Sequence, residues 1–418
     1  MNILVICSGS MGHYYGIKRF FDYIELGSEH NILYAFHGFN PEIGDSDPSR
    51  YHIPSFPAFL NYEFRYTKKI REIIKLKQHN YLLQNRTRTL FELFDYFIPD
   101  VILLDNHAFT DGFVLKKEFG KLGFNVVFFQ TRLSTELSMN SAYGSHYFGK
   151  LKWLPSQKIL LRQRVHELKY RLMMPGFNKY RQLDQYRKDI SLNLNMKRYR
   201  LPTISKIPEI LFSGVNLSQY QTENQKYMGL CIKPKWPGVK KSEKFQIMVS
   251  AGSVLNKLQY LDKFKKTIQN LIQRNPQYHF AVPNGFKVPT NSNTSFYTWD
   301  QYQDVLGQSH IHIAHGGFNS IKDSLSYAVP LLICPLDWES DQIQNALFIE
   351  ESKLSLTWNI RRDKVDDVIT KLEIIAIDNY SKRIQSFVLN DNSSYPPKKI
   401  KDEFSDLIQD PKWEIRNW

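Results

Sequence analysis

The sequence is poor in cysteine, has no long apolar run and carries too few acidic residues to balance its basic ones. Its three cysteines, Cys7, Cys231 and Cys334, are odd in number and lie far apart, which argues against a disulfide framework. No stretch approaches the roughly 20 apolar residues that span a bilayer. The start, MNILVIC, lacks the basic residues and the long apolar segment of a secretory signal. We therefore expect a cytoplasmic protein.

The basic excess narrows the classes of partner. The formal net charge is +14, which suits nucleic acid, an anionic membrane surface or a phosphorylated small substrate. The sequence has no zinc-ligand spacing, heptad repeat or aromatic RNA-binding motif, which makes nucleic acid the weakest of the three. We expect no nucleic-acid partner, whereas peripheral contact with the inner face of an anionic membrane stays open.

Length and hydrophobic content favour two domains. The chain has 418 residues, which is too long for one ordinary hydrophobic core, and 42% of them are hydrophobic, which is enough for a packed interior. Apolar runs alternate with amphipathic stretches of helical period. In the first half these patterns predict a helix over 13–25 and strands at Asn2–Cys7, 31–36, 100–104 and 125–129.

A segment rich in proline and lysine, 232–244, indicates a linker, and the same alternation restarts after it. The second series predicts strands at 246–251, 278–282, 310–314 and 331–334, and helices over 257–272, 319–327 and 341–351. Two successive α/β halves favour two doubly wound domains that face each other across a cleft.

Two basic stretches in the first half, 64–83 and 152–188, combine aliphatic residues with lysine and arginine at helical spacing. Both are typical of amphipathic helices. Each can be the solvated face of an ordinary domain helix. Each can also be an acceptor-side or membrane-surface patch, and the sequence leaves both interpretations open.

The stretch HGGFNSIKDSLSYAVPLLICPLDWESDQIQNA begins at His315, where an expected strand ends. Gly316 and Gly317 predict a tight turn that lets a ligand approach the backbone. Asn319 or Ser320 then opens a helix, whose N-terminal N–H groups and dipole attract phosphate. Asp323 lies one turn beyond Asn319 on the same face, where a carboxylate suits ribose hydroxyls.

This stretch resembles the nucleotide-sugar signature of family 1 glycosyltransferases, the UDP-glycosyltransferases of GT-B fold. The likeness lies in the pattern HGGFNS…D…AVP…P…DQ..NA. It implies that Asp323 holds the ribose, where the family usually has glutamate. It also implies a site for the diphosphate, formed by His315, Gly317, Asn319 and Ser320. The hydroxyls of the donor sugar would bind Asp341 and Gln342.

Three further segments of the second half resemble the same family. In MVSAGS the family pattern makes Ser253 a hydrogen-bond donor to phosphate, and in YTWDQYQDVL it makes Trp299 the ring that stacks on the base. YMGLCI, 227–232, is similar to the strand before the linker. The spacer before Asp341 is longer than is common in the family, and ungapped counting would place Glu339 and Ser340 at the sugar instead.

The resemblance also implies a catalytic pair in the first half. CSGSMGHYYGIKRFFDYI is similar to the family's first loop and helix, which makes His13 the general base, and VILLDNHAF supplies Asp105 as its partner acid. Histidine titrates near neutrality, which suits removal of a hydroxyl proton. A carboxylate on its other ring nitrogen stabilises the charged form.

Other chemistries fit the sequence less well. His310, His312 and His315 look like a metal cluster, but the glycine turn already explains His315. Asp45 and Asp47 match the metal-binding pattern of GT-A transferases, yet they lie in a Gly/Pro/Ser turn where aspartate is common. The glycines at 9, 12 and 16 lack the spacing of a dinucleotide loop. We expect neither a metal nor a cofactor, only a UDP-sugar as donor substrate.

The resemblance thus implies a GT-B fold with two Rossmann-like domains. An acceptor-binding domain is expected over 1–235, a donor-binding domain over 236–400, and a C-terminal helix over 401–418 that packs back on the first domain. We expect an inverting, metal-independent hexosyltransferase acting on a hydroxyl of a small or lipophilic acceptor. Two alternatives stay open: a GT-B nucleotide-sugar epimerase or hydrolase, and a binding protein without catalysis.

Overall fold

The computed structural model of the chain describes most of the second half and parts of the first. The described residues are 1–7, 11–27, 29–37, 50–53, 81–105, 108–131, 194–195, 203–204, 207–213, 225–252, 260–286, 288, 292–336 and 342–417. They contain two parallel sheets, one in each half of the chain, and a two-stranded antiparallel pair, β6 (Leu194–Asn195) with β7 (Thr203–Ile204). The basic stretch 152–188 and most of 64–83 lie outside the described residues.

The sheet of the first half has seven strands in the order β3-β2-β1-β4-β5-β8-β9. Their bounds are β1 Asn2–Cys7, β2 Asn31–His37, β3 Arg50–Ile53, β4 Val101–Asp105, β5 Asn125–Gln130, β8 Glu209–Leu211 and β9 Gln225–Tyr227. The described helices of this half are α1 Met11–Ile24, α3 Tyr81–Tyr96 and α4 Phe109–Phe119. The order reverses at β1, which pairs with β2 on one side and β4 on the other. The carboxyl ends of β1 and β4 therefore lie next to each other.

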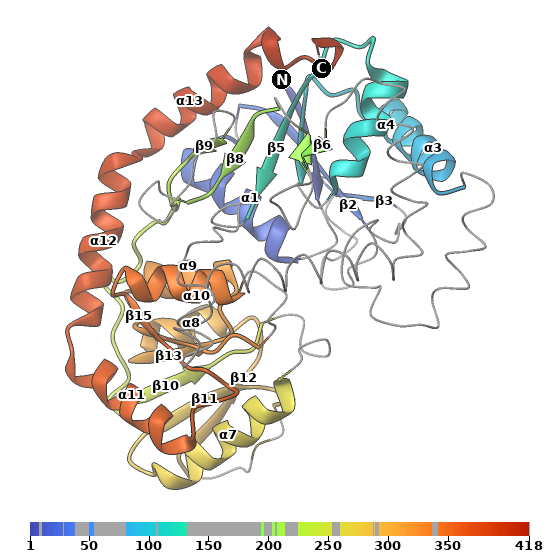
Figure 1. Cartoon of the computed structure of the whole chain (residues 1–418). Coiled ribbons are helices and arrows are strands. Elements are labelled where there is room, and N and C mark those ends of the chain that lie inside the picture. Colours follow the sequence, from blue (N-terminus) through green and yellow to red (C-terminus); the bar gives the residue numbers. More distant parts are fainter. Residues whose placement is uncertain are drawn as a thin grey trace, which may run out of the picture.

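The sheet of the second half has six parallel strands in the order β12-β11-β10-β13-β14-β15. These strands are β10 Gln246–Val249, β11 His279–Pro283, β12 Thr294–Tyr297, β13 Ile311–Ala314, β14 Leu331–Ile333 and β15 Ser355–Thr357. The helices are α7 Leu261–Arg274, α8 Tyr302–Gln308, α9 Phe318–Ser326, α10 Gln342–Glu351, α11 Val365–Ile377, α12 Tyr380–Ser394 and α13 Pro397–Gln409, with 3-10 turns Pro411–Trp413 and Ile415–Asn417. The chain thus has the expected α/β fold with two doubly wound sheets (Figure 1).

The strands are buried on both faces, which explains their nearly continuous apolar runs. Alternate residues of β1 enter opposite cores: Leu4 and Ile6 pack with α3 and α4, whereas Ile3 and Val5 pack with α1 and α13. The second half repeats this arrangement, because Ile247 and Met248 on β10 belong to different clusters. Both halves therefore have a core on each side of their sheet.

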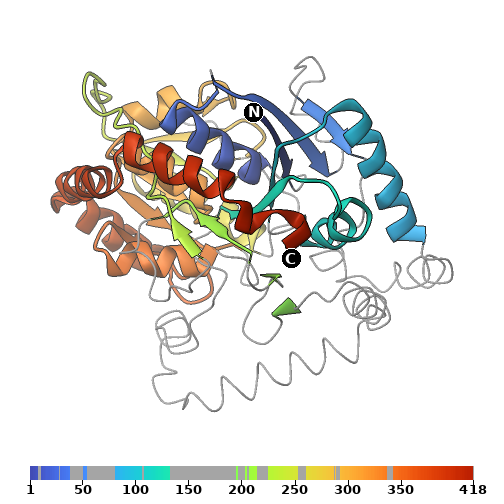
Figure 2. The same cartoon turned by 90° about the horizontal axis from the view of Figure 1, so that it is seen from above.

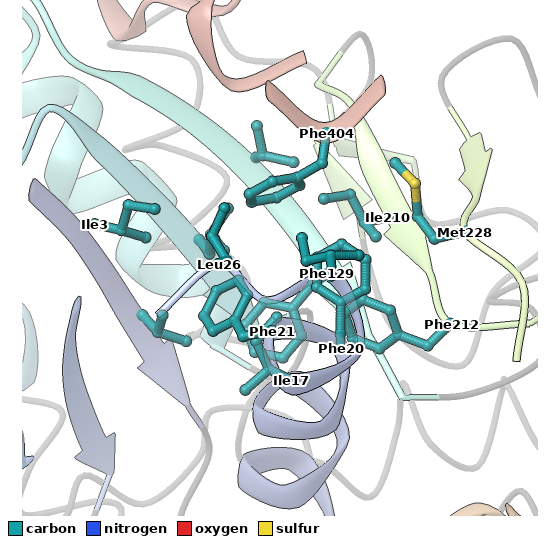
Figure 3. Packing of buried hydrophobic residues seen from close by; sticks show 14 of the residues in the cluster. Ile3, Ile17, Phe20, Phe21, Leu26, Phe129, Ile210, Phe212, Met228 and Phe404 are labelled. Carbon is teal, nitrogen blue, oxygen red and sulfur yellow. The ribbon is translucent and has the colours of Figure 1, made fainter. Parts of the chain in front are cut away.

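The end of the chain returns to the first half. α12 packs on the core of the second half through Ile384 and Val388, and α13 then runs along the first half beside α1 (Figures 1 and 2). Phe404 of α13 meets Phe20 of α1 edge-on, with ring centroids 5.2 Å apart, inside an aromatic cluster that also holds Phe212 (Figure 3). The two halves are thus connected at two places along the chain.

The segment expected as a linker is irregular and is anchored by α12. Asp391 accepts a hydrogen bond from the N–H of Leu230 (2.8 Å), and Asn392 donates one to the carbonyl of Ile232 (3.0 Å). The strand expected at 227–232 is wrong beyond its first residue, because β9 ends at Tyr227. Gly229, with φ +73°, turns the chain there, and this left-handed conformation favours glycine.

Other expected elements differ by a few residues at their ends. The strand expected at 246–251 ends at Val249, and the helix α9 begins at Phe318 rather than at Asn319 or Ser320. Strands β12 and β15 and helices α11 and α12 were not predicted. Among the described helices, none is long and apolar enough to cross a membrane.

Candidate active site

His13 and Asp105 lie together at the carboxyl edge of the first sheet. His13 is in the first turn of α1, and Asp105 is the last residue of β4. The His13 Nδ1 and Asp105 Oδ2 atoms are 2.8 Å apart, with the histidine side chain 14% exposed and the carboxylate fully buried. With Nδ1 facing the carboxylate, Nε2 is left to accept a proton. The pair therefore has the geometry of a positioned general base.

His315 follows β13 at the carboxyl edge of the second sheet, and its ring stands between two glycines. A Cβ atom on Gly252 would lie 2.5 Å from the imidazole, and one on Gly317 would lie 2.5 Å from Nε2. Such distances are far below van der Waals contact, so the side chain fits only because both residues lack a Cβ. Gly252 and Gly317 thus share one function, which is to make room for this ring.

The helix α9 starts immediately after this turn. Its N-cap residue is Gly317, without a side-chain cap, so the expectation that Asn319 or Ser320 opens the helix is wrong. Both residues lie instead in the first turn, where backbone N–H groups have no partner within the helix. Gly316 has φ +90°, and a Cβ there would meet the Ile333 side chain and the carbonyl of Gln342. This turn and helix start form a potential anion site.

Asp323 lies one turn further along α9 and is buried. Arg19, from α1 of the other half, places Nη2 2.5 Å from Asp323 Oδ1, and Gln303 donates to the same oxygen at 3.1 Å. Sequence reasoning missed both partners. Gln303 lies in the segment that follows Trp299 and was within reach of prediction, whereas nothing in the local sequence links Arg19 to a residue 304 positions away.

Trp299 has the exposure that base stacking requires. Its side chain is 60% exposed, and one face of the ring stacks on Tyr302, with centroids 5.0 Å apart and planes inclined by 28°. Tyr302 is buried and lies edge-on to His312. One face of the indole therefore packs on Tyr302, and the exposed part of the ring can stack on a planar ligand.

The sugar end of the expected site is described only in part. Gln342 is buried, and its side-chain oxygen accepts a hydrogen bond from the N–H of Leu336 at 2.9 Å. Asn345 donates to the carbonyl of Gly316 at 3.0 Å, which fixes α10 against the glycine turn. Ser253, Glu339, Ser340 and Asp341 lie outside the described residues. The roles assigned to these side chains remain predictions.

The histidines of β13 have separate partners. His310 Nδ1 accepts the N–H of Gln246 at 3.1 Å. His312 lies between the hydroxyls of Ser250 (2.7 Å) and Ser324 (2.6 Å), and burial lowers its pKa to about 3. Within the described ranges no group of three His, Cys, Asp or Glu side chains could hold a metal, and Asp45 and Asp47 lie outside those ranges.

Comparison with known proteins agrees with this architecture. Residues 241–389 match the glycosyltransferase family 28 C-terminal domain. A putative UDP-glucuronosyltransferase of Caenorhabditis elegans is 27% identical over 164 residues, 36% of this chain and 31% of that protein. Human UDP-glucuronosyltransferase 2B17 is 27% identical over 161 residues, 36% of this chain and 30% of the human protein. The aligned region spans about a third of the length of these curated relatives.

Solved structures match over nearly the whole chain. The glycotransferase of kitacinnamycin aligns with a TM-score of 0.68 and 15% identity, covering 97% of this chain and 99% of that one. The calicheamicin glycosyltransferase CalG4 aligns with a TM-score of 0.60 and 14% identity, covering 98% of both chains. The fold is therefore GT-B, and the sequence matches support a UDP-glycosyltransferase superfamily member.

Proposed function

We propose that this chain is an inverting family 1 glycosyltransferase that moves a hexose from a UDP-sugar to a hydroxyl of a small or lipophilic acceptor. One contact carries the proposal. The side-chain amide of Asn319, in the first turn of α9, donates to the carbonyl of Gly12 at 2.5 Å. Gly12 immediately precedes His13 in α1. The candidate base and the candidate donor site therefore meet at this contact between the two halves.

The donor is held by the second half. The uracil stacks on Trp299, the ribose hydroxyls bind Asp323, and the diphosphate lies at the start of α9 beside His315. Ser253, Asn319 and Ser320 donate to the phosphates, and Asp341 with Gln342 orients the sugar. Hydrogen-bond donors and a helix dipole aimed at the diphosphate stabilise the charge that develops as UDP leaves.

The first half supplies the base. As the acceptor oxygen attacks the anomeric carbon, the bond to the UDP oxygen breaks and the acceptor proton passes to Nε2 of His13. Asp105 stabilises the imidazolium through Nδ1, because it is a buried carboxylate 2.8 Å away. Attack opposite the leaving group inverts the anomeric configuration. The +14 net charge also favours anionic donors.

We propose further that transfer needs no metal and no cofactor. The start of α9 and His315 together provide the positive potential that a divalent cation supplies in metal-dependent transferases. EDTA is expected to leave the rate unchanged. Loss of activity in EDTA that manganese restores would contradict this part of the proposal and direct attention to Asp45 and Asp47.

A donor screen tests the proposal. UDP-sugars and their TDP and GDP counterparts are compared by thermal shift, and the best donor is incubated with cell extract for mass spectrometry. The expected result is a UDP-hexose that raises the melting temperature, and an extract component that gains the mass of one hexose with wild-type protein but not with His13→Ala. If no nucleotide sugar raises the melting temperature, the proposal is contradicted.

The same screen separates the alternatives. Free sugar or an epimerised donor formed without acceptor would favour a GT-B epimerase or hydrolase. Binding without any turnover, in wild type and His13→Ala alike, would favour a nucleotide-sugar-binding protein. For a product with a known acceptor, NMR of the new anomeric centre decides between inversion and retention.

A further inference from the structure

One face of α1 is turned toward the start of α9. Gly12, Gly16 and Arg19 recur at helical spacing and so share a face. The Gly12 carbonyl accepts a hydrogen bond from the Asn319 amide, and Arg19 Nη1 donates one to the Asn319 carbonyl at 3.4 Å. A Cβ on Gly16 would lie 2.3 Å from the Thr131 side chain and 4.0 Å from Asn319 Oδ1. The long Arg19 side chain reaches along α9 to its next turn.

At that turn the Arg19 guanidinium meets the carboxylate of Asp323. The Nη2–Oδ1 distance is 2.5 Å, and the two side chains are 30% and 9% exposed. Gln303 donates to the same oxygen from α8. Two donors on Oδ1 fix the plane of the carboxylate, and a buried carboxylate without a partner would be costly. The orientation of Asp323 therefore depends on a residue of the other half.

Charge gives Arg19 a second effect. A nucleoside diphosphate is strongly anionic, and an unpaired carboxylate beside it would repel it through a medium of low dielectric constant. Paired with Arg19, Asp323 can accept ribose hydroxyls without adding net negative charge to the site. The ion pair between Arg19 and Asp323 thus favours donor binding as well as contact between the two halves.

We propose that Arg19 is a positioning residue for donor binding, which holds Asp323 in the orientation that ribose recognition requires. The proposal rests on the proposed function, because it assigns Arg19 a role in the same donor site. It makes the first half a determinant of nucleotide affinity, through a residue that itself need not touch the nucleotide.

Calorimetry with UDP and 2′,3′-dideoxy-UDP tests it. Wild type is expected to prefer UDP, and Arg19→Met is expected to bind UDP about 10- to 100-fold more weakly, as befits loss of a hydrogen bond to a charged group. The preference for UDP over the dideoxy ligand should shrink as well, which a merely structural change would not produce. Lys18→Met is the matched control, because Lys18 is the adjacent cation of α1 and pairs with Asp22 of the same helix.

The outcomes are distinguishable. If Arg19→Met lowers the affinity for both ligands equally, or for neither, the inference is wrong while the proposed function stands. If wild type does not bind UDP, the proposed function fails and the inference with it. Should Arg19→Met be poorly folded, Arg19→Lys keeps the charge without the planar fork, and it is expected to retain part of the UDP preference.

Discussion

The two halves of the molecule share one architecture but differ in how their functional residues are distributed along the chain. In the second half, most of the residues proposed to bind the donor lie between His315 and Gln342, around the end of β13, the glycine turn and the starts of α9 and α10. In the first half, the candidate base and its acid are 92 positions apart, and they meet only because β1 and β4 are neighbours. A diphosphate site is thus local, whereas a proton-transfer pair is made by topology.

The comparison has a second aspect, because neither half completes its site alone. Arg19 of the first half holds Asp323, and Asn319 of the second half holds the residue next to His13. Substitutions in either half should therefore divide into those that affect chemistry, those that affect donor affinity and those that affect stability alone.

The largest effect is expected from the base. His13→Ala should lower the transfer rate about 100- to 10,000-fold, because a positioned general base is removed. The measurement is a single-turnover rate with the acceptor found by mass spectrometry. His30→Ala is the control, since His30 lies in the same half but outside the pair. A rate within twofold of wild type for His13→Ala would mean that the first half contributes no base.

Smaller, but still specific, is the effect of filling the space beside His315. Gly252→Ala places a Cβ 2.5 Å from that ring in a backbone with φ +77°, and we expect UDP binding to weaken about tenfold or more because the ring must move. Gly285→Ala is closely matched, with φ +82° and nothing within 4 Å. Both variants should lose about 1 kcal/mol of stability from backbone strain, and only Gly252→Ala should lose UDP affinity. Equal UDP affinity in the two variants would contradict the role of the turn.

These residues show which features of the fold and of the candidate site could be predicted from the sequence. The central strands of both sheets follow from apolar runs, so the doubly wound fold was predictable. The N-cap of α9 was not, because Asn319 and Ser320 are both good caps and only the observed backbone assigns that position to Gly317. Arg19 at Asp323 escaped prediction, because a side-chain contact between the two halves leaves no local pattern, whereas Gln303 follows Trp299 and was within reach. The acceptor side falls largely outside the described residues.

The buried histidine of the second half gives a pH-dependent prediction. The pKa of His312 is about 3 when folded and near 6.5 as its ordinary value, so between these values the unfolded chain binds more protons and the free energy of unfolding decreases as the pH is lowered. From about pH 7.5 to about pH 5, wild type should lose on the order of 1–2 kcal/mol more than His312→Gln. Urea titrations at both pH values measure it, and equal losses in both proteins would show that His312 does not titrate this way.

The smallest effect is expected at a membrane. The basic residues of 64–83 could each contribute about 1 kcal/mol near an anionic surface at low salt. We expect salt-sensitive flotation with anionic vesicles and none with neutral ones, weakened by Lys68→Glu with Lys69→Glu. If the protein floats with neither kind of vesicle, a small aglycone in solution becomes the better acceptor hypothesis.

The central claim is that the second half binds the donor and the first half performs the chemistry on the acceptor. Calorimetric titration of UDP into wild type, His315→Ala and His13→Ala tests it directly, because UDP carries no sugar and requires no acceptor. We predict that wild type and His13→Ala bind UDP with the same affinity and that His315→Ala binds it about 10- to 100-fold more weakly. Normal affinity in His315→Ala, or an equal loss in both variants, would contradict the account.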